Sequence, residues 1–191
     1  MRKKHIAVFA SGTGSNAVRL IDHFMNDPSA SVVLVISNRE DAPVLSKAKD
    51  RGVETLVMEN SEISAGEKLL ESCRSRSIDL IALAGFLRKI PDVLVAAYAD
   101  RIINVHPSLL PKFGGPGMYG DHVHRAVLGA GEKETGITIH FVNEHFDEGQ
   151  KIASFHCPVV PEDTLETLRE RVQRLEHTWF PVVIEKTLSA L

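Results

Sequence analysis

The chain is 191 residues long and 43% hydrophobic, a size that suits a single well-filled core, so we expect residues 1–191 to form one domain. Acidic and basic residues are interspersed and the formal net charge is −3, which argues against a nucleic-acid partner or an anionic membrane surface. No apolar run approaches the roughly 18 residues of a membrane-spanning helix. Nothing resembles a signal peptide and the two cysteines lack metal-like spacing, so we expect a soluble cytoplasmic protein with reduced thiols.

The first motif is a glycine-rich turn between an expected strand and an expected helix. The apolar run 3–10 leads into Ser11-Gly-Thr-Gly-Ser-Asn16, after which apolar residues recur on one helical face. Such a turn presents free backbone N–H groups at the positive end of a helix, which suits a phosphate bound near Gly14, Ser15 and Asn16. It is neither a Walker loop nor a complete dinucleotide fingerprint, and a tight turn without a ligand stays an alternative.

Strands and helices then alternate. The run 31–37 is almost continuously apolar, and so is 79–84, as expected for strands covered on both faces. Several βαβ units in succession predict an α/β fold, an open and mostly parallel Rossmann-like sheet with helices on both faces. Further elements expected here are a helix at 41–51, a strand at 55–58 and a helix opened by a capping box of Ser64 and Glu67.

A loop at 85–91 follows the strand at 79–84 and lies at the same sheet edge as the glycine turn. Its apolar side chains, Phe86, Leu87 and Ile90, suit the wall of a pocket for a flat apolar ligand. They equally suit the packing of the next helix, and the sequence leaves both interpretations open.

The next expected strand ends in two polar residues. β-Branched residues precede them and prolines at 107 and 111 follow, so Asn104 and His106 stand where the strand stops. Residues two apart on a strand share a face, so the carboxamide and the imidazole are expected to point the same way. Ligands bind at the carboxyl ends of parallel strands, which makes the pair a candidate catalytic centre. The alternative is a turn-capping Asn beside a buried, satisfied His.

The segment 113–120 carries four glycines in eight residues, which predicts an irregular loop and suggests a mobile lid. His122 and His124 follow in an H-x-H pattern. A zinc site needs further ligands in tetrahedral geometry, which this loop does not supply, so no metal is expected.

The C-terminal third predicts two strands, at 136–142 and 152–160, joined by a turn-rich segment that contains Asp147. Strands joined so tightly are expected to add antiparallel to the sheet. A capping box of Asp163 and Glu166 then opens an amphipathic helix that carries Glu176.

Three motifs occur in a characteristic order and spacing: Ser11-Gly-Thr-Gly-Ser-Asn16, Asn104-x-His106-Pro-Ser-Leu-Leu-Pro111 and Gly136-Ile-Thr-x-His-Phe-x-x-x-x-x-Asp147. With them the chain resembles the phosphoribosylglycinamide formyltransferases, folate-dependent formyltransferases, over almost all of its length. The resemblance implies transfer of a formyl group from 10-formyltetrahydrofolate to glycinamide ribonucleotide in purine synthesis, without a metal.

The resemblance also implies roles for individual residues. It implies that the catalytic trio is Asn104, His106 and Asp147. It implies that the acceptor contacts are Gly14, Ser15, Asn16 and Glu176, and that the folate site comprises Leu87, Arg88, Lys89 and Ile90 together with Asn104. An arginine that the family pattern would place near 64–67 for the folate tail has no equivalent there.

The chemistry is consistent with these roles. An amine attacks the formyl carbon and a tetrahedral oxyanion collapses with loss of the folate nitrogen, while protons move at each end. Asn104 can donate a hydrogen bond to the oxyanion, His106 can exchange protons near neutral pH, and the Asp147 carboxylate favours the imidazolium. Two other functions stay open: a formyltetrahydrofolate deformylase, with water as the acceptor, and a non-catalytic binder of a phosphate metabolite.

Overall fold

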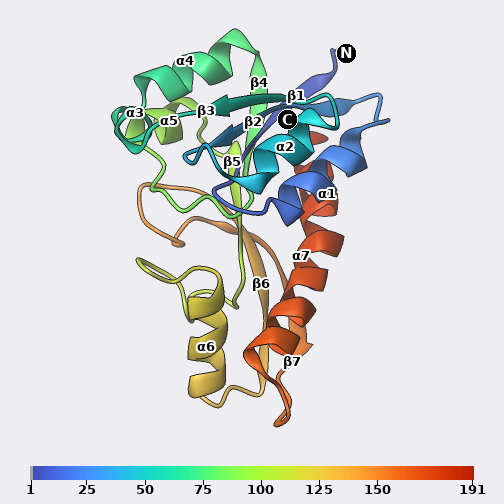
Figure 1. Ribbon diagram of the computed structural model, residues 1–191, viewed down its shortest axis with the longest axis vertical. Coiled ribbons are helices and arrows are strands. Elements are labelled where there is room, and N and C mark those ends of the chain that lie inside the picture. Colours follow the sequence, from blue (N-terminus) through green and yellow to red (C-terminus); the bar gives the residue numbers. More distant parts are fainter. Residues whose placement is uncertain (1) are drawn as a thin grey trace.

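The computed structural model describes residues 2–191 and is built on one seven-stranded sheet, with the strand order β3-β2-β1-β4-β5-β6-β7 (Figure 1). The first five strands of this order are parallel, whereas β6 pairs antiparallel with β5 and β7 antiparallel with β6. The predicted mostly parallel sheet with an antiparallel C-terminal addition is confirmed. The strands are β1 (Lys4–Phe9), β2 (Ala30–Ser37), β3 (Glu54–Val57), β4 (Ile78–Leu83), β5 (Ile102–His106), β6 (Glu134–Phe141) and β7 (Lys151–Pro158).

Helices cover both faces of the sheet, and each face has its own hydrophobic core. One core joins the sheet to α1, α2, α6 and α7, and the other joins it to α3, α4 and α5. Every residue of β4 is buried, as the apolar run in the sequence predicts for a strand between two helical layers. The helices are α1 (Ser15–Phe24), α2 (Pro43–Lys49), α3 (Asn60–Ala65), α4 (Glu67–Ser75), α5 (Asp92–Ala97), α6 (Asp121–Gly129) and α7 (Leu165–Leu188).

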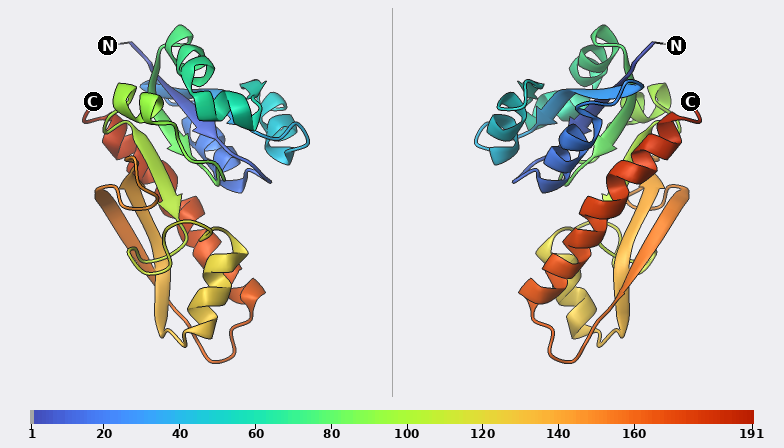
Figure 2. Two further views of the ribbon diagram at one scale, coloured as in Figure 1. Left: turned by 90° about the vertical axis from the view of Figure 1, so that its left-hand side faces the viewer. Right: turned by 90° about the vertical axis from the view of Figure 1, so that its right-hand side faces the viewer.

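The 24-residue helix α7 packs against both the parallel part of the sheet and the antiparallel β6–β7 pair. Figure 2 shows it running along the parallel strands at one end and beside α6 and the β6–β7 pair at the other. It contacts α1, α6, β5, β6 and β7, so residues from the first and last thirds of the chain meet on it. No helix within residues 2–191 is long and apolar enough to cross a membrane.

Two predicted capping boxes are wrong. The box before α3 uses Glu59 and Glu62, and the chain then turns through Gly66, in a left-handed conformation, directly into α4. Helix α7 begins after Thr164, which caps the backbone N–H of Thr167. The hydroxyl of Thr164 caps the helix. The carboxylate of Asp163 instead accepts two hydrogen bonds from Arg171, at 2.6 and 2.8 Å.

Candidate active site

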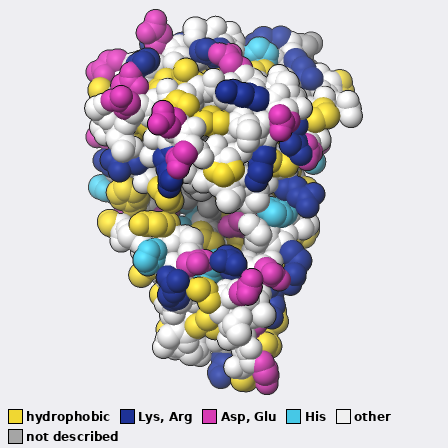
Figure 3. Space-filling view, viewed as in Figure 1, with side chains coloured by type: hydrophobic (Ala, Val, Ile, Leu, Met, Phe, Trp, Pro, Cys, Tyr) yellow, Lys and Arg dark blue, Asp and Glu magenta, His cyan; other side chains and the backbone are white. Residues whose placement is uncertain are grey.

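A cavity of about 500 Å³ opens where the carboxyl ends of β1, β4 and β5 meet the β6–β7 extension. Its walls come mainly from five segments, namely 12–16, 83–90, 104–107, 115–120 and 142–147, with further side chains from α6, β6 and α7. In the space-filling view the surface is hollowed at mid-height, between the upper and lower parts of the molecule (Figure 3). The sheet edge at which parallel strands end is where α/β proteins bind ligands, so this cavity is the candidate site.

His106, the last residue of β5, is held at both ring nitrogens and is only 4% exposed. Its Nε2 lies 2.8 Å from the carbonyl oxygen of Phe113, and because a carbonyl only accepts, this nitrogen carries a proton. Its Nδ1 lies 3.4 Å from Oδ1 of Asp147. The neutral ring therefore presents Nδ1 as its basic nitrogen, next to a carboxylate.

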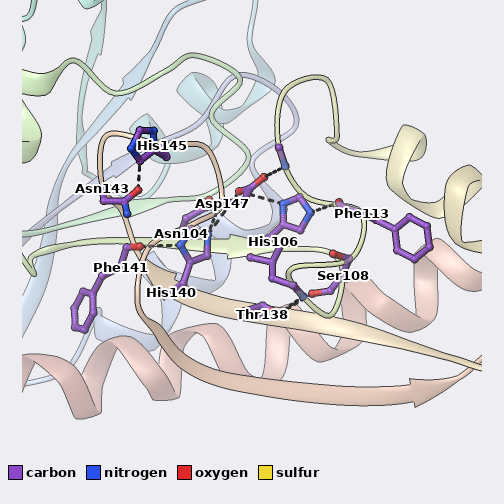
Figure 4. A network of polar contacts seen from close by, with 12 residues as sticks. Asn104, His106, Ser108, Phe113, Thr138, His140, Phe141, Asn143, His145 and Asp147 are labelled. Carbon is purple, nitrogen blue, oxygen red and sulfur yellow. Dashed lines mark hydrogen bonds and ion pairs between the residues drawn. The ribbon is translucent and has the colours of Figure 1, made fainter.

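Asp147 reaches His106 from the turn between β6 and β7, as Figure 4 shows. Its backbone has a positive φ of 58°, which Asp adopts more readily than most residues. Its second oxygen, Oδ2, accepts a hydrogen bond of 2.9 Å from the backbone N–H of Gly115, so the carboxylate joins the strand end to the glycine-rich loop. His106 and Asp147, which are about 40 positions apart in the sequence, thus meet in one site.

His140 of β6 is a site residue that the sequence reasoning passed over, although it stands in the third motif. Its Nδ1 donates to the carbonyl oxygen of Phe141 at 2.7 Å, and its Nε2 lies 3.1 Å from the Asn104 side-chain nitrogen and 3.7 Å from Asp147 Oδ1. In the neutral ring Nε2 accepts the Asn104 N–H, which fixes the orientation of the carboxamide (Figure 4).

Burial and nearby charges shift the pKa values of His106 and Asp147 in opposite directions. Burial lowers the pKa of His106, whereas the Asp147 charge and the Phe113 carbonyl raise it, and the net direction is downward. Burial raises the pKa of Asp147, but the nearby His140 ring, the charge of His106 and the Gly115 N–H together hold it below its usual range. At neutral pH the site therefore pairs a carboxylate with an imidazole that can accept a proton.

The glycine turn at the start of α1 also lines the cavity. Gly14 has a positive φ of 70°, and a Cβ there would collide with the side chain of Val44. The side chain of Asn16 donates to Glu176 Oε2 at 2.8 Å, and its own Oδ1 is buried without a partner among residues 2–191. Gln173 donates to Ser15 Oγ at 3.1 Å, a contact that sequence reasoning did not anticipate. The predicted turn residues and Glu176 thus share one wall.

The apolar residues of the loop after β4 divide between the hydrophobic core and the wall of the cavity. Phe86 packs edge-on against Phe9, with ring centroids 5.4 Å apart, and Ile90 is buried in the core. Leu87 is 51% exposed and lines the cavity together with Arg88 and Lys89. The loop is therefore core on one side and pocket wall on the other.

Only some of the backbone N–H groups in the loop after β4 have hydrogen-bond partners among residues 2–191. The N–H of Leu87 donates to Ser11 Oγ at 2.9 Å, whereas those of Arg88, Lys89 and Ile90 have no partner within residues 2–191. The free donors suit a heterocycle with polar edges.

Helix α6, which the sequence did not lead us to predict, begins at Asp121 and includes the H-x-H pair. His124 is buried and lines the cavity, and residues 2–191 contain no group of three or more His, Cys, Asp or Glu arranged to hold a metal. The segment 113–120 is irregular, as predicted, and its role as a mobile lid stays a prediction.

The chain matches known proteins over almost all of its length. A family model described as formyl transferase matches residues 4–184. The chloroplastic phosphoribosylglycinamide formyltransferase of Arabidopsis thaliana is 41% identical over 96% of this chain, which spans 65% of that protein. The trifunctional purine biosynthetic protein adenosine-3 of Drosophila melanogaster is 40% identical, and the chain spans 14% of it. The phosphoribosylglycinamide formyltransferase of Bacillus subtilis is 37% identical, with 97% of this chain and 95% of that protein covered.

Solved structures agree with the sequence comparison. The crystal structure of glycinamide ribonucleotide transformylase 1 from Symbiobacterium toebii superimposes with a TM-score of 0.91 at 34% identity, covering 98% of this chain and 89% of that one. The resemblance inferred from the three motifs is confirmed, and the chain belongs to the formyl transferase family, among relatives named phosphoribosylglycinamide formyltransferase.

Proposed function

We propose that this protein, as one formyltransferase domain over residues 1–191, transfers the formyl group of 10-formyltetrahydrofolate to the amine of glycinamide ribonucleotide in de novo purine biosynthesis. The observation that carries the proposal is that Asn104, His106 and Asp147 line one cavity together with a helix-opening glycine turn. The three side chains suit acid–base chemistry and the turn suits a phosphate. We retain the cytoplasm as the expected location.

The acceptor is assigned to the turn at 12–16 and to Glu176. Phosphate oxygens accept from backbone N–H groups at the start of α1, where the helix dipole favours negative charge. The unpartnered Oδ1 of Asn16 and the nearby carboxyl of Glu176 support hydrogen bonds to hydroxyl or amine donors of the acceptor.

The donor is assigned to residues 87–90 and Asn104. The free backbone N–H groups of Arg88, Lys89 and Ile90 can meet the polar edge of a pterin, and Leu87 offers it an apolar side chain. Asn104 stands between this loop and His106, where a formyl group would lie.

The proposed step forms one carbon–nitrogen bond and breaks another. The acceptor amine attacks the formyl carbon, its surplus proton passes to His106 Nδ1, and Asn104 donates to the oxyanion. Collapse breaks the bond between the formyl carbon and the folate nitrogen, which takes up a proton from the imidazolium. Asp147 stabilises the imidazolium, and the Phe113 carbonyl keeps the ring in the required tautomer. No metal is needed for this sequence of steps.

The test is a transfer assay that follows the absorbance of the released folate. Release that requires the ribonucleotide supports the proposal, and release in its absence supports a deformylase. No release by a folded protein that binds the ribonucleotide supports a non-catalytic binder. His106→Asn should abolish release, while His156→Gln, at an exposed histidine of β7 outside the cavity, should not change it.

A further inference from the structure

Among the side chains that line the cavity and that the proposed formyl transfer does not use are His124 of α6 and Arg169 of α7. His124 is 4% exposed, its Nδ1 is buried without a partner, and its ring makes no hydrogen bond within residues 2–191. Buried polar groups in native proteins are almost always hydrogen-bonded. An unpartnered ring on the wall of a cavity therefore points to a ligand.

Arg169 is held only loosely by its neighbours. Its guanidinium lies 3.4 Å from Asp121 Oδ1 and 3.9 Å from Glu166 Oε1, and its side chain is 44% exposed. Arg171 on the same helix, by contrast, donates twice to Asp163 at 2.6 and 2.8 Å. Because a half-exposed pair at such distances contributes little, the guanidinium of Arg169 can turn to another anion at small cost.

Arg169 lines the same cavity as the glycine turn and lies near it along α7. Gln173 lies one helical turn further along α7, on the same face, and donates to Ser15 Oγ at the start of α1. From the other side Asp121, the first residue of α6, reaches Arg169. Figure 2 shows α6 lying alongside this part of α7. Arg169 thus stands between the N-termini of α1 and α6, both of which favour negative charge.

We propose that Arg169, with the ring of His124 beside it, binds the phosphate of the acceptor from the side opposite the backbone turn at 12–16. This contact sets the preference of the enzyme for a phosphorylated acceptor over the corresponding riboside. The inference rests on the proposed function, because it assigns a further residue to the same acceptor. Asp121 competes with the phosphate for the guanidinium.

The first test compares glycinamide ribonucleotide with glycinamide riboside, by KM in the transfer assay and by Kd in calorimetry. Arg169→Gln should raise KM and Kd for the ribonucleotide about tenfold, as expected for loss of a charge-assisted hydrogen bond, with little change in kcat. The riboside should bind equally to both proteins. Arg169→Lys should give an intermediate value, and His124→Phe should weaken only the ribonucleotide.

A second variant should act in the opposite direction. Asp121→Asn removes the competing carboxylate and a negative charge near the phosphate, so the ribonucleotide should bind about twofold to fivefold more tightly, the range typical of an exposed ion pair. Arg174→Gln is the matched control, since Arg174 is an exposed arginine of α7 outside the cavity. Thermal unfolding of each variant shows that it is folded.

The outcomes separate this inference from the proposed function. If the wild type binds the ribonucleotide more tightly than the riboside, and Arg169→Gln removes that preference, the inference holds even if no formyl group is transferred. If Arg169→Gln keeps the full preference, or if the wild type shows none, the inference is overturned. In those cases an active wild type leaves the proposed function intact.

Discussion

His106 Nδ1 and Asp147 Oδ1 lie 3.4 Å apart, although His106 ends β5 and Asp147 lies in the turn between β6 and β7. The strand β5 delivers the imidazole and the turn after β6 delivers the carboxylate. This pairing requires the antiparallel addition of β6 to an otherwise parallel sheet, because the hairpin turn then opens on the same cavity as the end of β5.

The pair makes a first prediction. Asp147→Asn should lower kcat by about 10²–10⁴, as expected for loss of an acid–base partner, with modest changes in either KM. Since the Asp147 charge raises the pKa of His106 against the effect of burial, its removal should lower that pKa further, which NMR titration of the ring measures. His106→Asn and Asp147→Asn should combine non-additively.

The control for this pair is Glu148→Gln, which removes the neighbouring carboxylate of the same turn, exposed and outside the cavity. It should leave both kcat and the His106 pKa unchanged. Losses that simply multiply in the double variant, or a His106 pKa unmoved by Asp147→Asn, would show that the two residues act independently.

The extent to which the sequence predicts this site differs between its residues. Asn104 and His106 could be found because apolar runs predict parallel strands, whose ends meet at one edge of a sheet. His140 could not, since it comes opposite Asn104 only through the register of β6 on β5. The Phe113 carbonyl and the Gly115 N–H are backbone groups of an irregular loop, and no residue pattern indicates where such groups point.

Helix α6 and the residues that cap α3 and α7 are parts of the fold that the sequence likewise did not predict. The sequence around 121–129 begins after a run of glycines, and its apolar face is short, so the helix depends on packing against α7. Several residues before α7 can act as a cap. The structure uses Thr164, because Asp163 is engaged with Arg171.

A second prediction concerns the glycine turn. The sequence suggests that a side chain at Gly14 would crowd the phosphate, but its Cβ would collide with Val44, so the substitution disturbs the packing of α2 first. Gly14→Ala should therefore lower the free energy of unfolding by about 1–3 kcal/mol, from overpacking and the positive φ, measured by urea unfolding.

Gly12→Ala is the matched control in the same turn, because a Cβ at Gly12 meets nothing within 4 Å. It should leave the free energy of unfolding nearly unchanged. If it raises the acceptor KM without changing the donor KM, the added methyl group lies on the phosphate path. Equal effects on both substrates would contradict the assignment of this turn to the acceptor.

A third prediction concerns the donor. An antifolate analogue should protect the backbone amides of Arg88, Lys89 and Ile90 from hydrogen exchange, because these have no partner within residues 2–191. The amide of Leu87 should change less, since it already donates to Ser11 Oγ. Mass spectrometry with short overlapping peptides resolves the difference. Protection confined to α7 would rule out this placement of the folate.

The last prediction concerns Glu176 on α7, which is partly buried in the cavity wall. Burial raises its pKa from 4.5 to about 7, and the hydrogen bond from Asn16 only partly offsets this. A carboxyl group whose pKa is higher in the folded state contributes stability that is fully present below its unfolded value. That contribution is lost as the pH rises through the folded value, here between pH 4.5 and about 7.

Glu176→Gln places a neutral amide in the same position and should remove this dependence. The variant should match the wild type near pH 4.5 and exceed its free energy of unfolding at pH 8 by about 3 kcal/mol at most, as the pKa difference implies. Urea unfolding at both pH values measures the change. Glu170→Gln, at an exposed glutamate of the same helix, should leave the wild-type dependence intact, and parallel curves for wild type and Glu176→Gln would mean that Glu176 is already ionised in the folded protein.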